Sequence, residues 1–90
     1  MKLIEWNKDK NVKLKKERGV SFDQIESAIR EGKVLDIIDN PSSNFPGQDV
    51  YVIEMKVYIY YIPFVEDETK IFLKTIIPSR KGTKKYLYRK

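Results

Sequence analysis

The sequence predicts an α+β fold in which a small antiparallel β-sheet of four to five strands packs against two N-terminal helices. Two helical patterns, each followed by a glycine, occupy residues 8–32. Short apolar runs bounded by turn residues then follow at 34–39, 50–55, 57–64 and 71–77. Ninety residues leave little room for a second core, so we assign residues 1–90 to a single domain.

Capping signals define the two helices. After a short first strand at Leu3–Trp6, Asn7 can cap a helix that begins at Lys8 and ends at Gly19. Ser21 starts the second helix, and Gln24, three residues later, completes a capping box. Gly32 closes this helix. Its apolar residues repeat at helical spacing and are expected to pack against the sheet: Phe22, Ile25, Ala28 and Ile29.

The remaining strands are separated by turn chemistry. A strand at Val34–Asp39 is followed by a loop at 40–48 that is rich in Asn, Pro, Ser and Gly. Strands at 50–55 and 57–64 are joined by a tight connection near Lys56. Pro78 ends the strand at 71–77 because proline cannot donate to the ladder. Residues 81–90 form either a short helix or a tail, and the sequence leaves this open.

The last hairpin permits a prediction of its register. With Asp67 at the centre of the turn, Tyr60 would lie opposite Lys74. The face toward the helices would then carry Val57, Ile59, Tyr61, Ile71, Leu73, Thr75 and Ile77. The other face would carry Tyr58, Tyr60, Ile62, Phe72, Lys74 and Ile76. Tyr58 and Tyr60 would either stack on unpaired bases or pack under the C-terminal segment, whereas for Tyr61 we expect packing.

Charge is distributed unevenly along the chain. The net charge is +3 over residues 1–33, −6 over 34–69 and +8 over 70–90, where eight cations occur without an acidic residue. Such a cationic surface attracts polyanions because Lys and Arg displace counterions from a phosphate backbone. We therefore predict RNA as the partner. The cations and aromatic residues expected to contact it are Lys74, Lys81, Lys85, Tyr58, Tyr60, Lys13, Lys16 and Arg18.

Missing residue types restrict the chemistry. Without Cys or His, the chain has no thiolate nucleophile, no sulfur-based zinc site and no imidazole base, and we expect neither a metal nor a cofactor. The N-terminus lacks the apolar core of a signal peptide. The longest nearly apolar stretch, 57–65, is shorter than the roughly 20 residues of a membrane-spanning helix. We therefore expect a cytoplasmic protein without a membrane partner.

Both ends of the chain carry short motifs of a known kind. Ile4-Glu5-Trp6-Asn7 is followed by Lys10-Asn11 and then by Arg18-Gly19-Val20-Ser21-Phe22, and this order resembles the opening of the BrnT family of bacterial toxins. Pro78-Ser79-Arg80, followed by Thr83 and Tyr86, resembles the closing segment of that family. The middle of the chain matches only as a pattern of strands.

The resemblance implies a compact fold related to RelE-like toxins and a ribonuclease activity that arrests translation. It also implies neutralisation by a cognate antitoxin, often a small DNA-binding protein, so that DNA would be contacted only through the antitoxin complex. The family commonly has His before the Gly-Val-Ser-Phe run, where this chain has Arg18. Arginine keeps a positive charge but cannot exchange a proton near neutral pH.

RNA cleavage makes few demands on the protein, because the RNA supplies its own 2′-OH nucleophile. Positioning, charge stabilisation at phosphorus and proton transfer remain for the protein. Arg80 is the predicted phosphate clamp, since its planar fork can bind two oxygens. Lys84 and Tyr86 are predicted proton donors or phosphate ligands, with pKa values lowered by neighbouring cations. Glu5 is the one carboxylate proposed as a base, unless it is simply solvated at a strand edge.

Two other functions fit the same sequence. In the first, the chain is a non-catalytic nucleic-acid-binding module, with the helices on either side of Gly19 arranged as a helix-turn-helix. In the second, it is a protein-interaction domain whose basic surface binds an acidic partner. RNA, free or on the ribosome, together with an antitoxin, is the set of partners that the toxin interpretation requires.

Overall fold

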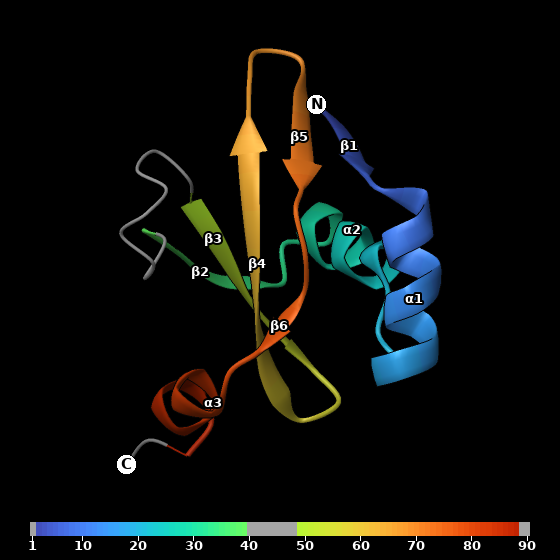
Figure 1. Ribbon diagram of the computed structural model, residues 1–90. Helices are drawn as coiled ribbons and strands as arrows, with labels where there is room; N and C mark the ends of the chain where they lie inside the picture. The colour runs from blue at the N-terminus through green and yellow to red at the C-terminus, as the bar shows by residue number, and fades with distance from the viewer. Residues whose placement is uncertain (1, 40–48, 89–90) are drawn as a thin grey trace.

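Two helices follow the first strand and a third helix follows the last strand in the computed structural model, which describes residues 2–39 and 49–88 (Figure 1). The predicted loop at 40–48 therefore lies outside the described residues. In chain order the elements are β1 (Leu3–Trp6), α1 (Lys8–Arg18), α2 (Phe22–Arg30), β2 (Val34–Asp39), β3 (Asp49–Met55), β4 (Tyr58–Glu66), β5 (Lys70–Leu73), β6 (Ile77–Pro78) and α3 (Arg80–Tyr86). The predicted α+β class is confirmed.

Both N-terminal helices begin at their predicted caps. The Asn7 side chain accepts a hydrogen bond from the Lys10 amide at 3.0 Å, and Gly19 ends α1 in the left-handed conformation with φ of 69°. Ser21 and Gln24 form the capping box of α2. No helix in the described part of the chain is long and apolar enough to span a membrane.

The sheet is mixed rather than wholly antiparallel. Its order is β1-β5-β4-β3-β2, with β6 also paired to β4 (Figure 1). β1 runs parallel to β5, with Leu3 opposite Lys70 and Trp6 opposite Leu73, while the other pairs are antiparallel. No hairpin turn joins β1 to its partner, so local turn chemistry does not set its direction.

One face of the sheet holds the main core beneath α1 and α2. The helices contribute Leu14, Val20, Phe22, Ile25 and Ala28, and the strands contribute Tyr51, Ile53, Tyr60, Ile62, Phe64, Ile71 and Leu73, with Ile76 from the segment after β5. Trp6 of β1 stacks on Phe22 with ring centroids 5.8 Å apart. The alternate residues of β4, including Ile59 and Tyr61, point to the opposite face, where α3 lies.

The predicted register of the β4–β5 hairpin is wrong. Phe64 lies opposite Leu73 and Val65 lies opposite Phe72. The turn is therefore centred between Glu68 and Thr69, whereas the prediction centred it on Asp67. The reason is the Asp67 carboxylate, whose Oδ1 accepts hydrogen bonds from the amides of Thr69 (2.8 Å) and Lys70 (2.9 Å). These bonds place Asp67 at the first position of the turn.

This register exchanges the faces that the sequence predicted for β4, whereas Ile71 and Leu73 of β5 lie on the core face as predicted. Tyr60 and Ile62, expected to face solvent, are 9% and 0% exposed and belong to the main core. Ile59 and Tyr61, expected to face α1 and α2, lie on the α3 face instead. Side chains alternate between the two faces along a strand. A shift of the pairing by an odd number of residues therefore moves every side chain of one strand to the opposite face of the sheet from the one predicted.

The predicted strand at 71–77 is divided into β5 and β6. The Lys74 amide donates to the Pro63 carbonyl at 2.8 Å, but Pro63 has no N–H to donate in return. The ladder therefore stops, and it resumes at Ile77 opposite Tyr61. The interruption turns Ile76 into the core, where it is fully buried.

The Asp67 turn gives a prediction for the pH dependence of stability. Hydrogen bonds from the Thr69 and Lys70 amides lower the pKa of Asp67, so its contribution is present above the unfolded pKa and is lost as pH falls through the folded pKa. We expect Asp67→Ala to lower the urea midpoint at neutral pH and to match the wild-type chain at acidic pH. Asp67→Asn, which keeps an acceptor oxygen without the charge, is the control. An equal loss in Asp67→Ala at both pH values would contradict this prediction.

Candidate functional site

The segment that the sequence left open forms helix α3. The Ser79 side chain caps it by accepting a hydrogen bond from the Gly82 amide at 2.9 Å, and the Thr83 amide donates to the Ser79 carbonyl at 2.9 Å. Arg80 is therefore the first residue of a helix. Arg80 and Lys84 are four residues apart, as are Lys81 and Lys85, so each pair lies on one side of α3, one turn apart.

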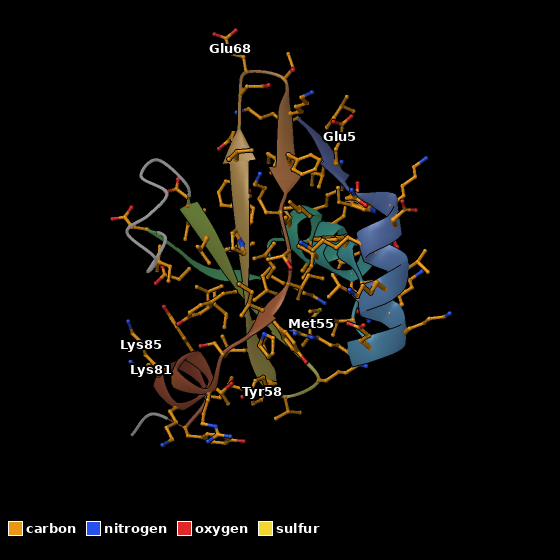
Figure 2. The ribbon with its side chains drawn as sticks, viewed as in Figure 1. Glu5, Met55, Tyr58, Glu68, Lys81 and Lys85 are labelled. Carbon is orange, nitrogen blue, oxygen red and sulfur yellow. The ribbon has the colours of Figure 1, made fainter. Side chains whose placement is uncertain are left out.

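Two small residues seat α3 on the sheet. The Thr83 hydroxyl accepts a hydrogen bond from the Ile59 amide at 2.9 Å and donates to the Ser79 carbonyl at 2.8 Å. A Cβ on Gly82 would lie 2.8 Å from Cγ2 of Ile59 and 3.0 Å from Cε1 of Tyr61, so the helix backbone approaches β4 closely. As a result the four cations of α3 are exposed, and Figure 2 shows Lys81 and Lys85 projecting away from the sheet.

Tyr86 is engaged by β2. Its hydroxyl donates a hydrogen bond to Oδ2 of Asp36 at 2.9 Å. Partial burial, followed by this hydrogen bond and the negative charge of Asp36, raises the pKa of Tyr86. The expectation that neighbouring cations lower this pKa is wrong, because the nearest charged partner of the phenol is a carboxylate. In this arrangement Tyr86 holds the end of α3 against the sheet.

Lys74 lies on the same face of the sheet as α3. Its Nζ is 5.9 Å from the ring centroid of Phe72, which places both side chains on the face opposite the main core. The Lys74 amide bonds Pro63, two residues along β4 from Tyr61, which lies under α3. Two strand residues span roughly 7 Å, so Lys74 is close to the row that carries α3.

The predicted aromatic contacts to RNA need correction. Tyr60 is buried in the main core, and Tyr58 packs against that core with its ring 5.8 Å from Tyr60. Burial on the α1–α2 face prevents Tyr60 from stacking on a base, and it gives Tyr58 a packing role. Tyr61 packs, as expected, but it does so beneath α3 and not on the predicted face toward α1 and α2. The aromatic residue beside Lys74 is Phe72, which the predicted register already placed on the face of Lys74 but which was not predicted to contact RNA.

A second group of cations lines a groove between α1 and residues 75–77. We call it the α1 groove; it encloses about 230 Å³ and is lined by Lys10, Lys13, Leu14, Glu17, Arg18, Thr75, Ile76 and Ile77. Nη1 of Arg18 donates to the Ile76 carbonyl at 3.3 Å. Lys16 does not line the groove. Lys10 was not predicted as a site residue, although its spacing from Lys13 and Glu17 places all three residues on one side of α1.

Ion pairing separates the cations into two classes. Five are paired with carboxylates: Lys2 with Glu66, Lys15 with Asp23, Arg30 with Glu26, Lys33 with Glu31 and Lys70 with Glu5. Among the described residues, Lys74 and the four cations of α3 form no ion pair, and neither do those of the α1 groove. Lys8, Lys16 and Lys56 also form no ion pair with the described residues, so most but not all of the uncompensated charge lies along the segment 74–85 and in the groove beside it.

Glu5 lies apart from the cations of α3. Glu5 is near Lys70, with a separation of 3.8 Å, beside Phe72 at the β1 edge, and Figure 2 places it far from Lys81 and Lys85. It is half exposed, consistent with solvation at a strand edge. Within residues 2–39 and 49–88, no three carboxylates come together in a way that could hold a metal ion.

Comparison with other proteins found no similarity to report: no family model matches the chain, and neither the curated proteins nor the solved structures gave a match.

Proposed function

We propose that this protein is a metal-independent endoribonuclease of the toxin type, which binds RNA on the surface formed by Lys74 and α3. The observation that carries this proposal is the set of cations without acidic partners along residues 74–85, held on a helix that is fastened to the sheet. Phosphates of RNA supply the missing negative charge. The resemblance of the two chain ends to BrnT toxins supplies the type of activity.

The chemistry assigned to this surface is attack of the RNA 2′-OH on the adjacent phosphorus, in which the hydroxyl proton passes to water, the bond from phosphorus to the 5′-oxygen breaks and a 2′,3′-cyclic phosphate forms. Arg80 and Lys84, one helical turn apart, would bind the oxygens that gain negative charge as the transition state forms. Lys84 is also the proposed proton donor to the leaving oxygen. Tyr86 is left out of proton transfer, because its hydroxyl already donates to Asp36 and its pKa is raised.

The biological setting follows from the resemblance alone. A toxin of this kind would act in the cytoplasm on RNA, free or on the ribosome, and would arrest translation. A cognate antitoxin would neutralise it by covering the cations, and DNA would be contacted only through that complex. The exposed cations of α3 offer an acidic antitoxin segment the same charge complementarity that they offer RNA.

A second function, RNA binding without cleavage, is favoured by one observation. Among the described residues no carboxylate forms an ion pair with Arg80, and the phenol of Tyr86 is already engaged, so no general base beside Arg80 is evident. A protein of this kind would protect RNA or block its use by competition.

The two functions separate in one assay. The purified chain is incubated with single-stranded RNA in EDTA, beside a Lys33→Ala variant that removes an ion-paired cation elsewhere on the molecule. Cleavage by both chains is the expected result. Binding in a gel-shift assay without cleavage would support the second function, and cleavage that EDTA abolishes would contradict a metal-independent reaction.

A further inference from the structure

The α1 groove combines an apolar base with a charged rim. Leu14 lies at its base with Ile76 behind it, and both are almost fully buried. Ile77 is 44% exposed at its edge. Because Leu14 and Ile76 are already buried, the apolar surface of the groove that a flat group would remove from water belongs mainly to Ile77.

The rim of the groove carries donors without acceptors. Lys10 and Lys13 lie one helical turn apart, and neither forms an ion pair with any described residue. Arg18 uses one N–H for the Ile76 carbonyl, and the remaining donors of its guanidinium have no partner among the described residues. Glu17, on the same wall, adds the only acidic side chain of the lining.

This combination fits a nucleotide better than simpler ligands. A free phosphate would leave the apolar base uncovered, and an apolar peptide would leave the lysines without a partner. A nucleotide supplies a flat base, an anionic phosphate, and hydroxyl or amino groups that can donate to the Glu17 carboxylate. About 230 Å³ lies below the roughly 300–1,000 Å³ of sites for drug-sized ligands, so the groove can hold at most one nucleotide, part of which stays outside it.

The groove is a near neighbour of Arg80. Ile77 lines the groove, and Arg80 follows three residues later, so their Cα atoms are at most about 11 Å apart. The intervening residues are fixed, because Ile77 pairs with Tyr61 and the Ser79 amide donates to the Ile59 carbonyl at 2.9 Å. Because α1 and α3 lie on opposite faces of the sheet (Figure 1), a single strand that binds both sites passes around the outer side of β6, which pairs only with β4 among the described strands.

We propose that the α1 groove is a subsite for one unpaired nucleotide of the RNA, next to the phosphate bound by Arg80. The inference rests on the proposed function for the identity of the polymer. It adds that the substrate is single-stranded at this position and that Lys10, Lys13 and Arg18 bind the phosphate of the nucleotide flanking the cleaved bond.

The first test is an NMR titration of the full chain in EDTA with adenosine 5′-monophosphate, uridine 5′-monophosphate and inorganic phosphate as separate probes. We expect both nucleotides to shift the amide resonances of Thr75, Ile76 and Ile77, and to bind more tightly than phosphate. A Lys10→Ala/Lys13→Ala variant should bind them about ten-fold or more weakly, since charged hydrogen bonds are lost. Lys15→Ala, which removes an ion-paired lysine of the same helix, should bind normally. Nucleotides that shift no groove resonance, or bind the double variant as well as wild type, would overturn the inference.

A second test separates this inference from the proposed activity. On a single-stranded oligonucleotide, the double variant should show a raised KM with kcat unchanged, because Arg80 remains in place. If the double variant cleaved RNA with the KM of the wild-type chain, the proposed activity would be supported and the proposed subsite would be rejected. Nucleotide binding in the groove by a chain that cleaves no RNA would support the subsite and reject the catalytic proposal.

Discussion

Arg80→Ala is expected to abolish RNA cleavage while leaving the fold intact. The side chain is exposed at the start of α3 and forms no ion pair with the described residues, so its removal leaves no buried group unsatisfied. Loss of one donor to a charge that develops in the transition state lowers kcat by about 100- to 1000-fold. The measurement is the single-turnover cleavage rate of an end-labelled RNA, with thermal unfolding of the variant recorded beside it.

Two further variants sharpen this experiment. Arg80→Lys keeps the charge but loses the fork, so partial activity is expected. Lys81→Ala removes a neighbouring cation on the other side of α3, and it should weaken RNA binding with little change in kcat. Cleavage by Arg80→Ala at the wild-type rate would remove Arg80 from the mechanism. If Lys81→Ala lost as much of the cleavage rate as Arg80→Ala, the role of Arg80 would be reduced to its positive charge.

Thr83→Val is expected to detach α3 from the sheet. Valine matches threonine in shape but has no hydroxyl, so the Ile59 amide loses its acceptor in a buried setting. A buried donor left unsatisfied costs about 1–3 kcal/mol, and the free energy of unfolding in urea should fall by that amount. RNA affinity should fall with it, because α3 carries four of the cations that are proposed to bind the phosphates.

Thr75→Val is the matched control for stability. The Thr75 hydroxyl makes no hydrogen bond with the described residues, so the same substitution there should leave the free energy of unfolding nearly unchanged. If Thr83→Val were as stable as wild type and bound RNA equally well, then the hydrogen bond between Thr83 and Ile59 would not be needed to hold α3 and its cations in place.

The parts of the fold that local chemistry controls could be predicted from the sequence. Asn7, Ser21 and Gln24 mark helix starts through hydrogen bonds to residues three positions away, and these bonds form as expected. The turn at Lys56 was also expected. Its conformation was not, because Lys56 and Val57 adopt φ of 56° and 60°, a region where Asn and Gly are usual and a β-branched residue is strained.

The parts that distant contacts control could not be predicted. The parallel direction of β1 depends on residues 70–73, and the engagement of Tyr86 depends on Asp36, fifty residues earlier in the chain. The exchange of faces between Tyr60 and Tyr61 arose from the acceptor bonds of a single side chain, Asp67. The cations of the candidate site were found from composition, whereas their grouping around the segment 74–85 required the sheet.

The pairing of β1 with β5 also sets the order in which a newly made chain can be completed. A chain leaves the ribosome from its N-terminus, yet Leu3 finds its partner only when Lys70 has emerged. Until then β1 has no neighbouring strand, while α1, α2 and the β2–β3–β4 meander can already form. Contacts of such long sequence separation are slow to close. Since α3 follows β5, the surface proposed to bind RNA is assembled after the other described helices and strands have emerged.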